Sequence, residues 1–467
     1  MLAEARIFHG RASAVTAAFS HLYDLGNACL GCGRPRQASL AYRRALVLAP
    51  AEAPLLSNAG EAMAALGSHE TALAWHRRAL CVSPDASLTM ASLVRAWTRL
   101  GSVDNACRAA RQTVSNTPSL LAGLINAGLA IGTAGQRRSA ELVYRRALAL
   151  DADSAEARFA LASARLSAGD LIEGFKLYEA RFNLPAVPVA ALSPGVPIWS
   201  GETRPGLRLL LHCEQGYGDS IHFIRYALLL ARRGLKVWVR CPEPLLRLFA
   251  QLQPTIRLCR LDDRLPEVDA QAALMSVPFL LATDLATIPA EVPYLAPGLT
   301  QASKTPTRKR RSRKIGIAWA GRPEQMSDRM RSMPVTALSA LVAEIVATGD
   351  RAFSLQVGPR RSDLTEIAGS VVDLGQSFQD FADTAAALAE LDLTIAVDSA
   401  VGHLAGALAL PVWLLLAYVP EWRWLEGRPD SPWYPTMRLF RQPTPGNWSA
   451  MIADVGRALR ELAVDGR

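Results

Sequence analysis

The chain has 467 residues, of which 50% are apolar and 20% charged, and its formal net charge is +9. At roughly 150 residues per domain this length predicts about three domains, and the apolar content excludes a disordered chain. Seven scattered cysteines, an odd number, exclude a disulfide framework and favour a reducing compartment, with the cytoplasm as the expected location.

Neither an export signal nor a membrane span is expected. The N-terminal stretch MLAEARIFHGRASAVTAAF contains Glu4, His9 and Arg11 where a signal peptide needs an unbroken apolar core. The longest window without Asp, Glu, Lys or Arg is 399–420, which has the length of a bilayer-spanning helix. Because Pro411 and two glycines interrupt this window, we expect a short helix followed by a strand.

Glycines recur every 34 residues in the first part of the chain, at Gly33, Gly67, Gly101, Gly135 and Gly169. The same register aligns a second set of positions, namely Tyr42, His76, Ala110, Tyr144 and Tyr178. Such a period predicts five copies of a helix pair, with a glycine turning the chain between the helices of each pair. We place this repeat region at residues 1–183.

The repeats resemble the tetratricopeptide repeat across residues 19–182, with the glycine, alanine and proline positions in register. The resemblance implies a right-handed α-solenoid whose concave face binds a peptide, a partner protein, a glycan acceptor or a second copy of the chain as a homodimer. The alternative is that the repeats only scaffold the residues that follow.

Five prolines in 184–205 end the helical period and mark a linker. The next residues predict a βαβ unit with a parallel sheet: a strand at 207–212, a glycine-containing loop, a helix at 220–233 and a strand at 236–240. This first α/β lobe extends over 206–297. Its short length leaves room for the repeats to complete an acceptor site.

A basic connector, 298–313, separates the first lobe from a second one at 314–467. The sequence KTPTRKRRSRK holds seven basic residues between Lys304 and Lys314. Such a run is typical of nucleic-acid binding or nuclear import, but no aromatic residues interleave it for base stacking. We therefore expect a solvated connector, and nucleic acid is not an expected partner.

The second lobe repeats the α/β pattern and ends in a helix. Strands are expected at 314–319, 352–357 and 393–397, and helices near 335–348, 380–389 and from 399, with a terminal helix at 448–464. The predicted fold class is thus an α-solenoid followed by two Rossmann-like α/β lobes.

Three stretches could carry chemistry. The first is Gly216-Tyr217-Gly218-Asp219-Ser220, between strand and helix, where two glycines allow a tight turn and the close approach of a ligand. Asp219 lies at the helix start, where it is also a favoured N-cap worth about 1 kcal/mol. Without a third glycine the stretch does not meet the dinucleotide fingerprint. Catalysis and capping both remain open for Asp219.

The second stretch is the loop 320–334, which groups Asp328, Arg329, Arg331 and Ser332 after a strand. The planar fork of arginine binds phosphate through two parallel hydrogen bonds, so two arginines suit a diphosphate. The alternative is a solvated loop in which the arginines pair with Asp328.

The third stretch joins the strand 393–397 to a helix through Asp398 and Ser399. Asp398 is expected to cap the helix, whose free backbone N–H groups would form an anion site. Ser399 and His403 are four residues apart and share one helical face. A lone histidine on an apolar helix is usually a core residue. Its position at the carboxyl end of a strand favours ligand binding instead.

Several motifs in the same order resemble the glycosyltransferase lobes of the heptosyltransferase family and, in domain plan, the O-linked N-acetylglucosamine transferases. They are EQGYGD at 214–219, IAWAG at 317–321, DRMRS at 328–332, DSAVGHLAGA at 398–407, WRW at 422–424 and SPWYP at 431–435. The resemblance implies a two-lobed GT-B fold and an inverting, metal-independent transfer. It requires no cofactor, because a nucleoside-diphosphate sugar is the substrate.

By the same resemblance Asp219 is the catalytic base that activates the acceptor hydroxyl. The donor and its phosphates would be held by Gly216, Gly218, Asp328, Arg329, Arg331, Ser332, Asp398, Ser399 and His403. The second loop departs from the family pattern at Arg322, Gln325 and Ser327, which take the places of Asn, His and Asn. A non-catalytic repeat scaffold with a degenerate transferase lobe is therefore the alternative prediction.

Overall fold

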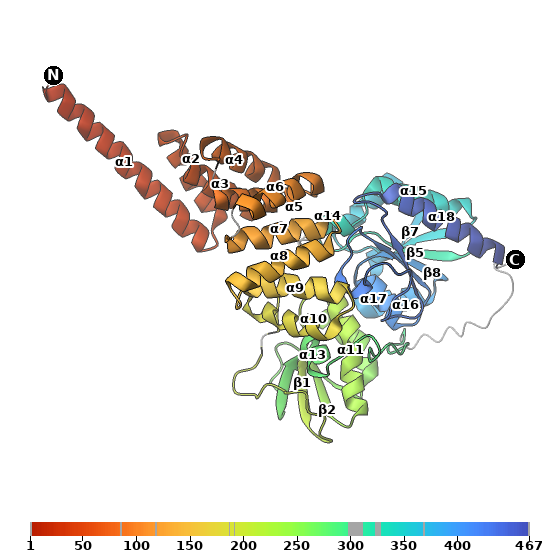
Figure 1. Cartoon of the computed structure of the whole chain (residues 1–467). Helices are drawn as coiled ribbons and strands as arrows, with labels where there is room; N and C mark the ends of the chain where they lie inside the picture. Colours follow the sequence, from red (N-terminus) through yellow and green to blue (C-terminus); the bar gives the residue numbers. More distant parts are fainter. Residues whose placement is uncertain are drawn as a thin grey trace. The chain divides into compact units, whose positions relative to one another are not determined.

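The computed structural model describes residues 2–84, 86–116, 119–185, 187–190, 192–297, 312–322, 328–367 and 369–465, and side chains from 15 to 462 within them. The chain divides into two compact units, 1–164 and 165–467, coloured from red to yellow and from yellow to blue in Figure 1. The division falls inside a helix of the fifth repeat copy, whose second helix belongs to the second unit. Most of the basic connector, 298–311, lies outside the described residues.

Paired helices fill the first unit, which confirms the predicted repeats. They are α1 (Leu2–Gly31), α2 (Pro35–Leu48), α3 (Ala53–Ala65), α4 (His69–Val82), α5 (Ser87–Arg99), α6 (Val103–Asn116), α7 (Leu121–Thr133), α8 (Arg137–Leu150) and α9 (Ala155–Ser167). Each predicted turn glycine has a positive φ, from 68° at Gly33 to 86° at Gly169. Only glycine adopts this conformation without strain, which explains the 34-residue period.

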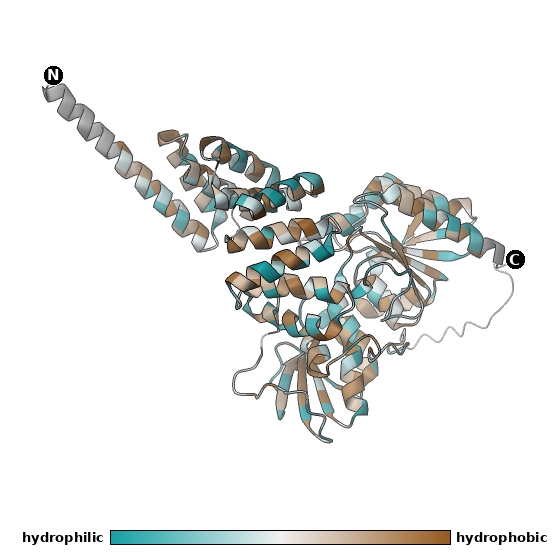
Figure 2. Ribbon diagram, viewed as in Figure 1, coloured by the Kyte–Doolittle hydropathy of each residue, from teal (hydrophilic) through white to brown (hydrophobic). Residues whose placement is uncertain are grey.

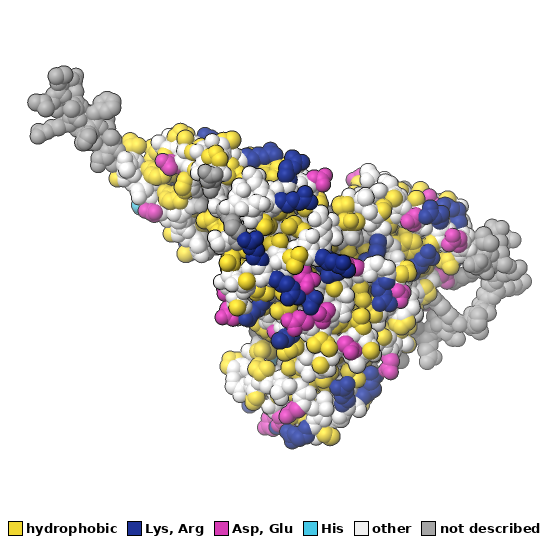
Figure 3. Space-filling model, in the orientation of Figure 1, with side chains coloured by type: hydrophobic (Ala, Val, Ile, Leu, Met, Phe, Trp, Pro, Cys, Tyr) yellow, Lys and Arg dark blue, Asp and Glu magenta, His cyan; other side chains and the backbone are white. Residues whose placement is uncertain are grey.

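A second glycine packs the two helices of several copies together. A Cβ at Gly26, Gly60 or Gly128 would lie 2.3–2.6 Å from the ring of Tyr42, His76 or Tyr144, respectively. Each of these rings therefore lies directly on the backbone of the neighbouring helix. On the face shown in Figure 3, basic side chains are distributed along the repeats with apolar side chains between them.

After the last residues of α9, the second unit continues with α10 (Leu171–Tyr178) and the 3₁₀ helix η1 (Glu179–Asn183). Its first sheet is parallel, with strand order β3-β2-β1-β4. The strands are β1 (Arg208–His212), β2 (Lys236–Arg240), β3 (Arg257–Cys259) and β4 (Ala270–Ala273). The helices are α11 (Tyr217–Arg232), α12 (Glu243–Phe249), η2 (Ala250–Leu252), η3 (Leu274–Ser276) and α13 (Val277–Leu280). The predicted βαβ unit is present as β1–α11–β2.

The second sheet is also parallel and has the order β10-β9-β8-β5-β6-β7. Its strands are β5 (Lys314–Ala318), β6 (Arg351–Ser354), β7 (Val371–Asp373), β8 (Leu393–Val397), β9 (Val412–Leu416) and β10 (Met437–Arg441). The helices are α14 (Asp328–Arg331), α15 (Val335–Ala347), η4 (Pro359–Ile367), η5 (Gly375–Ser377), α16 (Phe381–Ala389), α17 (Ala400–Ala407), η6 (Trp422–Trp424) and α18 (Trp448–Asp465). The α/β class of this region is thus confirmed.

The core of the second lobe lies between this sheet and the helices α15 and α18. It buries Leu338, Leu341 and Ile345 of α15 against Ile315 and Ile395 of the strands, and Figure 2 shows these elements in mainly apolar colours. Among the described residues one helical stretch, 328–347, is long and apolar enough for a membrane span. Its α15 part packs into this core. The window 399–420 instead holds α17 and β9.

Candidate functional site

The first candidate stretch forms the start of α11, and the helix begins three residues earlier than predicted. Gly216 is the N-cap, and Asp219 lies in the first turn. The Asp219 Oδ2 atom accepts a hydrogen bond from the Gly216 backbone N–H at 2.8 Å. Asp219 is therefore the third residue of α11 rather than its N-cap, and its side chain binds back to the N-cap backbone N–H at the positive end of the helix.

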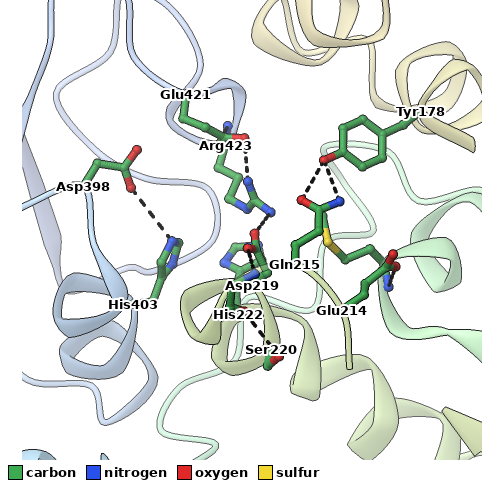
Figure 4. Close-up of polar contacts among 12 residues, drawn as sticks. Tyr178, Glu214, Gln215, Asp219, Ser220, His222, Asp398, His403, Glu421 and Arg423 are labelled. Atoms are coloured by element: carbon green, nitrogen blue, oxygen red, sulfur yellow. Dashed lines mark hydrogen bonds and ion pairs between the residues drawn. The ribbon is translucent and has the colours of Figure 1, made fainter. Parts of the chain in front are cut away.

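The other carboxylate oxygen of Asp219 pairs with an arginine that is distant in sequence. Arg423, on η6, donates to Asp219 Oδ1 and, at 2.5 Å, to Glu421 Oε1. Figure 4 shows the three side chains together between the two lobes. The guanidinium also lies 4.3 Å from the centre of the Trp422 ring, a distance typical of a cation–π contact.

Burial shapes the protonation of this cluster. It raises the pKa of Glu421 to about 7, against the opposing effect of Arg423. Burial alone would lower the pKa of Arg423, but Glu421 and Asp219 outweigh it and raise that pKa. Arg423 is thus a permanent buried cation, and Glu421 is the member of the cluster whose charge changes near neutral pH.

The start of α11 meets the start of α17 in the second lobe. A Cβ on Gly218 would lie 3.0 Å from His403 Cδ2 and 3.4 Å from Ala400 Cα. The space beside Gly218 is therefore occupied by α17. This corrects the expectation that the glycine leaves room there for a ligand. The contact brings the carboxyl ends of β1 and β8 to one place, as ligand sites of parallel sheets require.

At the start of α17 the N-cap is Ser399, which corrects the expectation that Asp398 caps this helix. The Ser399 side chain makes no capping bond, and its buried hydroxyl has no hydrogen-bond partner among the described residues. Asp398 Oδ1 lies 4.0 Å from His403 Nε2. Burial raises the pKa of Asp398, and Arg331 opposes this.

His403 belongs to a buried chain of polar groups that joins the lobes. The Tyr434 hydroxyl lies 3.0 Å from His403 Nδ1 and 2.9 Å from His222 Nδ1. One hydroxyl has one proton, so it donates to one imidazole and accepts from the other. Burial, followed by nearby arginines, holds the pKa of both histidines well below the usual range. Both imidazoles are therefore neutral at pH 7.

The second candidate stretch is only partly visible, because Gln325 and Ser327 lie outside the described residues. Ser332 Oγ donates to Asp328 Oδ1 at 2.8 Å and accepts from the Gly321 N–H at 3.0 Å. A hollow of about 420 Å³ is lined by Asp328, Arg329, Ser332, Pro334, Arg360 and Trp448. The aspartate and serine of this stretch thus fix the loop after β5.

Arg331 pairs with Asp328 and acts on two of the other candidates. Its Nε lies 3.4 Å from Asp328 Oδ1. A Cβ on Gly321 would lie 2.2 Å from its Nη2 atom. It also acts electrostatically on both Asp398 and His403. Of the predicted donor-binding residues, Asp398 and His403 lie close together, and Arg331 acts electrostatically on both.

Sequence reasoning did not identify four residues of this site: Tyr178, Arg181, Glu421 and Arg423. Arg181 is fully buried and donates to Glu214 at 2.8 and 3.1 Å. Tyr178 bonds to Gln215 at 3.2 Å. The repeats do contain a signal for Arg181. In the other four copies the aligned position holds a small residue, so a long charged side chain there is a departure from the pattern; these residues are Ala45, Ala79, Thr113 and Ala147. No comparable signal marks the pairing of Arg423 with Asp219.

Comparisons with known proteins place the chain near one curated protein and several repeat structures. No family model matches the chain. Protein FlbA of Caulobacter vibrioides is 27% identical over 344 residues, which cover 67% of this chain and 56% of FlbA. The chain thus matches little more than half the length of that relative.

Among solved structures, a thermophilic tetratricopeptide-repeat protein of Thermus thermophilus is 24% identical, with a TM-score of 0.34 over 36% of this chain and 92% of its own. PilF of Pseudomonas aeruginosa is 13% identical, with a TM-score of 0.34 over 47% of this chain and 85% of its own. MamA of Desulfovibrio magneticus is 16% identical, with a TM-score of 0.32 over 36% and 98%. The tetratricopeptide-like fold of the first unit is shown by its helix pairs and by the turn glycines that recur every 34 residues.

Proposed function

We propose that the chain is a glycosyltransferase of the two-lobed GT-B type. It would transfer a sugar from a nucleoside-diphosphate sugar to a protein or glycan acceptor that the repeats recruit. The observation that carries the proposal is the meeting of α11 and α17, which gathers Asp219, Arg423, Asp398 and Arg331 at the carboxyl ends of strands from two parallel sheets.

In this proposal the diphosphate of the donor binds at the start of α17. Ser399 offers a hydroxyl that has no hydrogen-bond partner within the part of the chain that the structure describes, and the first N–H groups of the helix carry partial positive charge. Arg331 supplies a cation close to Asp398. These groups would neutralise the charge that develops on the departing diphosphate, so a metal ion is not required.

Asp219 is the proposed base. A carboxylate offers about four lone-pair directions, and the Gly216 N–H and Arg423 occupy two of them. The acceptor hydroxyl would pass its proton to a remaining position while its oxygen bonds to the anomeric carbon. The bond from that carbon to the diphosphate breaks, and the nucleoside diphosphate leaves. Attack from the opposite side inverts the anomeric centre.

Replacing Asp219 tests this role. Asp219→Asn keeps the shape of the side chain but removes the base, so transfer should fall about 10²–10⁴-fold while the affinity for donor stays within twofold. Asp262→Asn, at a side chain that is 84% exposed in the same lobe, should leave both unchanged. Turnover by Asp219→Asn at the wild-type rate would remove Asp219 from the mechanism.

A second function, that of a non-catalytic adaptor, is favoured by one observation. Arg423, Asp219 and Glu421 already satisfy one another's charges, as they would in a purely structural cluster. An adaptor would capture a stoichiometric partner through its repeats, and it would neither bind nor cleave any sugar nucleotide. A pull-down combined with a sugar-nucleotide hydrolysis assay separates the two functions.

A further inference from the structure

The second helix of the fifth repeat copy departs from the pattern of the other copies. In copies one, two and four, a ring of the second helix lies on a glycine of the first, as Tyr144 does on Gly128. In the fifth copy Ala162 replaces that glycine, although Tyr178 keeps the aromatic position. An added Cβ at Gly128 would lie 2.3 Å from Tyr144. The pairing therefore cannot recur unchanged in the fifth copy.

Tyr178 contacts the loop between β1 and α11. Its hydroxyl lies 3.2 Å from both Oε1 and Nε2 of Gln215, as Figure 4 shows. Its ring packs on Trp422 at 6.1 Å. Gln215 has a φ of 59°, in the left-handed region that disfavours residues other than glycine and asparagine. Such a conformation persists only when surrounding contacts hold it.

The neighbouring residue of the loop is held by the same helical segment. Arg181 binds Glu214 through two hydrogen bonds, and both side chains are fully buried. Glu214 Oε1 also accepts from the Met275 N–H at 3.2 Å. The last repeat thus fixes Glu214 and Gln215, and Gly216, which follows directly, donates the backbone N–H that binds Asp219.

We infer that Tyr178 is a positioning residue of the candidate site: it holds Gln215 in its left-handed conformation, and the loop in turn sets the carboxylate of Asp219. This inference rests on the proposed function for its effect on turnover. Its structural part, the fixing of the loop by the fifth repeat copy, is independent of any activity. The second helix of the fifth repeat copy, which belongs to the second unit, would thereby supply a part of the site.

The test uses the full chain with Tyr178→Phe, which removes one hydroxyl, and Tyr144→Phe as the matched control from the preceding copy. Loss of the hydrogen bonding between Tyr178 and Gln215 should speed amide hydrogen exchange at residues 214–219 by about tenfold, and turnover should fall by about tenfold with KM within twofold. Gln215→Asn tolerates the same backbone conformation but is too short to reach Tyr178, so it should behave like Tyr178→Phe. Tyr144→Phe should change neither quantity.

Amide hydrogen exchange and turnover together distinguish failure of this inference from failure of the proposed function. Unchanged exchange at 214–219 in both loop variants would overturn the inference whatever the turnover does. Faster exchange with unchanged turnover would also overturn it, because the loop would not set Asp219. Faster exchange in the variants of a chain that neither binds nor turns over a sugar nucleotide would support the fixing of the loop and refute the proposed function.

Discussion

Gly321 shows how one small residue can place a charge. The guanidinium of Arg331 lies where a side chain at this position would have to be, and an added Cβ would approach Nη2 to 2.2 Å. Arg331 in this position acts electrostatically on Asp398. A glycine at the carboxyl end of β5 thus belongs to the proposed phosphate site although it binds nothing itself.

Gly321→Ala should displace Arg331 and weaken the binding of a nucleoside diphosphate as Arg331→Gln does. A charge-assisted hydrogen bond contributes about 1.5–3 kcal/mol, so Kd should rise roughly 10–100-fold in both variants. Titration calorimetry on the folded variants measures this. Gly31→Ala, where an added Cβ meets nothing within 4 Å, is the control. Equal affinities for wild type and Arg331→Gln would exclude Arg331 as a ligand, and equal affinities for wild type and Gly321→Ala would show that Gly321 does not set its position.

We expect the free energy of unfolding to depend on pH because His403 is buried. Its pKa is well below 6.5 in the folded chain because burial, Arg423, Arg225 and Arg331 disfavour the imidazolium. The unfolded chain therefore binds more protons as pH falls below about 6.5, and this histidine lowers the free energy of unfolding there. Glu421 acts in the opposite sense, because its folded-state pKa of about 7 lies above its unfolded value.

His403 and Glu421 have opposite effects on the pH dependence of the free energy of unfolding. A substitution of His403 alone therefore separates its contribution from that of Glu421. His403→Asn keeps a hydrogen-bonding group for Tyr434 but cannot titrate, so its stability should fall less steeply than that of wild type between pH 7 and pH 5. Urea unfolding at several pH values measures the difference. His21→Asn, at an exposed histidine, should follow wild type. Parallel curves for wild type and His403→Asn would show that His403 is not buried as a neutral imidazole.

The junction between η1 and the β1–α11 loop depends on a buried ion pair. Burial raises the pKa of Glu214 against the effect of Arg181, so the charged form of Glu214 depends on its partner. Glu214→Gln should lower the free energy of unfolding by about 3–5 kcal/mol, because it leaves Arg181 without its main counter-charge. Asp153→Asn, at a pair whose acid is 92% exposed, should cost below about 1 kcal/mol.

A second substitution distinguishes loss of charge balance from loss of packing. The double variant Arg181→Met/Glu214→Leu removes both charges, so it should recover most of the stability that Glu214→Gln loses. Denaturant midpoints of wild type, Glu214→Gln and the double variant give this comparison. A double variant as unstable as the single one would mean that the pair contributes through shape alone.

Elements with a strong local signal could be predicted from the sequence, and contacts between distant elements could not. The 34-residue glycines predicted the helix pairs, and apolar runs predicted β1, β2 and β8. The short strands β3, β4 and β7 lack an alternating or long apolar pattern, so they were not predicted. The sequence predicts that α11 begins at residue 220, three residues after its actual start, because the N-cap Gly216 has no polar side chain to mark the helix end.

In the candidate site, too, local features could be predicted from the sequence and contacts between distant residues could not. The sequence predicts Asp219 at the start of the helix that follows one strand and Ser399 and His403 on the helix that follows another, and parallel sheets bring such helix starts together. It did not show that Arg423 pairs with Asp219, because 204 residues separate them and an arginine between two tryptophans has many possible partners. It also did not show that α17 occupies the space beside Gly218.

The whole chain combines a repeat unit and an α/β unit, and the proposed function assigns them different ligands. Arg95 and Glu61 occupy aligned positions on the first helices of adjacent copies and pair at 2.5 Å. Arg95→Glu would place two carboxylates together and change the charge of this repeat surface. We expect the KM for acceptor to rise several-fold while the Kd for donor nucleotide is unchanged.

Steady-state kinetics with varied acceptor, and calorimetry with nucleotide, measure these two quantities. Arg44→Glu, on an exposed position of α2, changes the net charge equally and should leave both unchanged. A change of KM in both variants would indicate a general effect of charge. A change in nucleotide affinity would show that the units do not act on separate ligands.

Titration calorimetry of the full chain with UDP, GDP, ADP, CMP and dTDP tests the transferase proposal most directly. We expect at least one of these nucleotides to bind with a Kd in the micromolar range, and Arg331→Gln to weaken that binding roughly 10–100-fold. Absence of binding for all five nucleotides and for their sugar conjugates would contradict the proposal and leave the adaptor function.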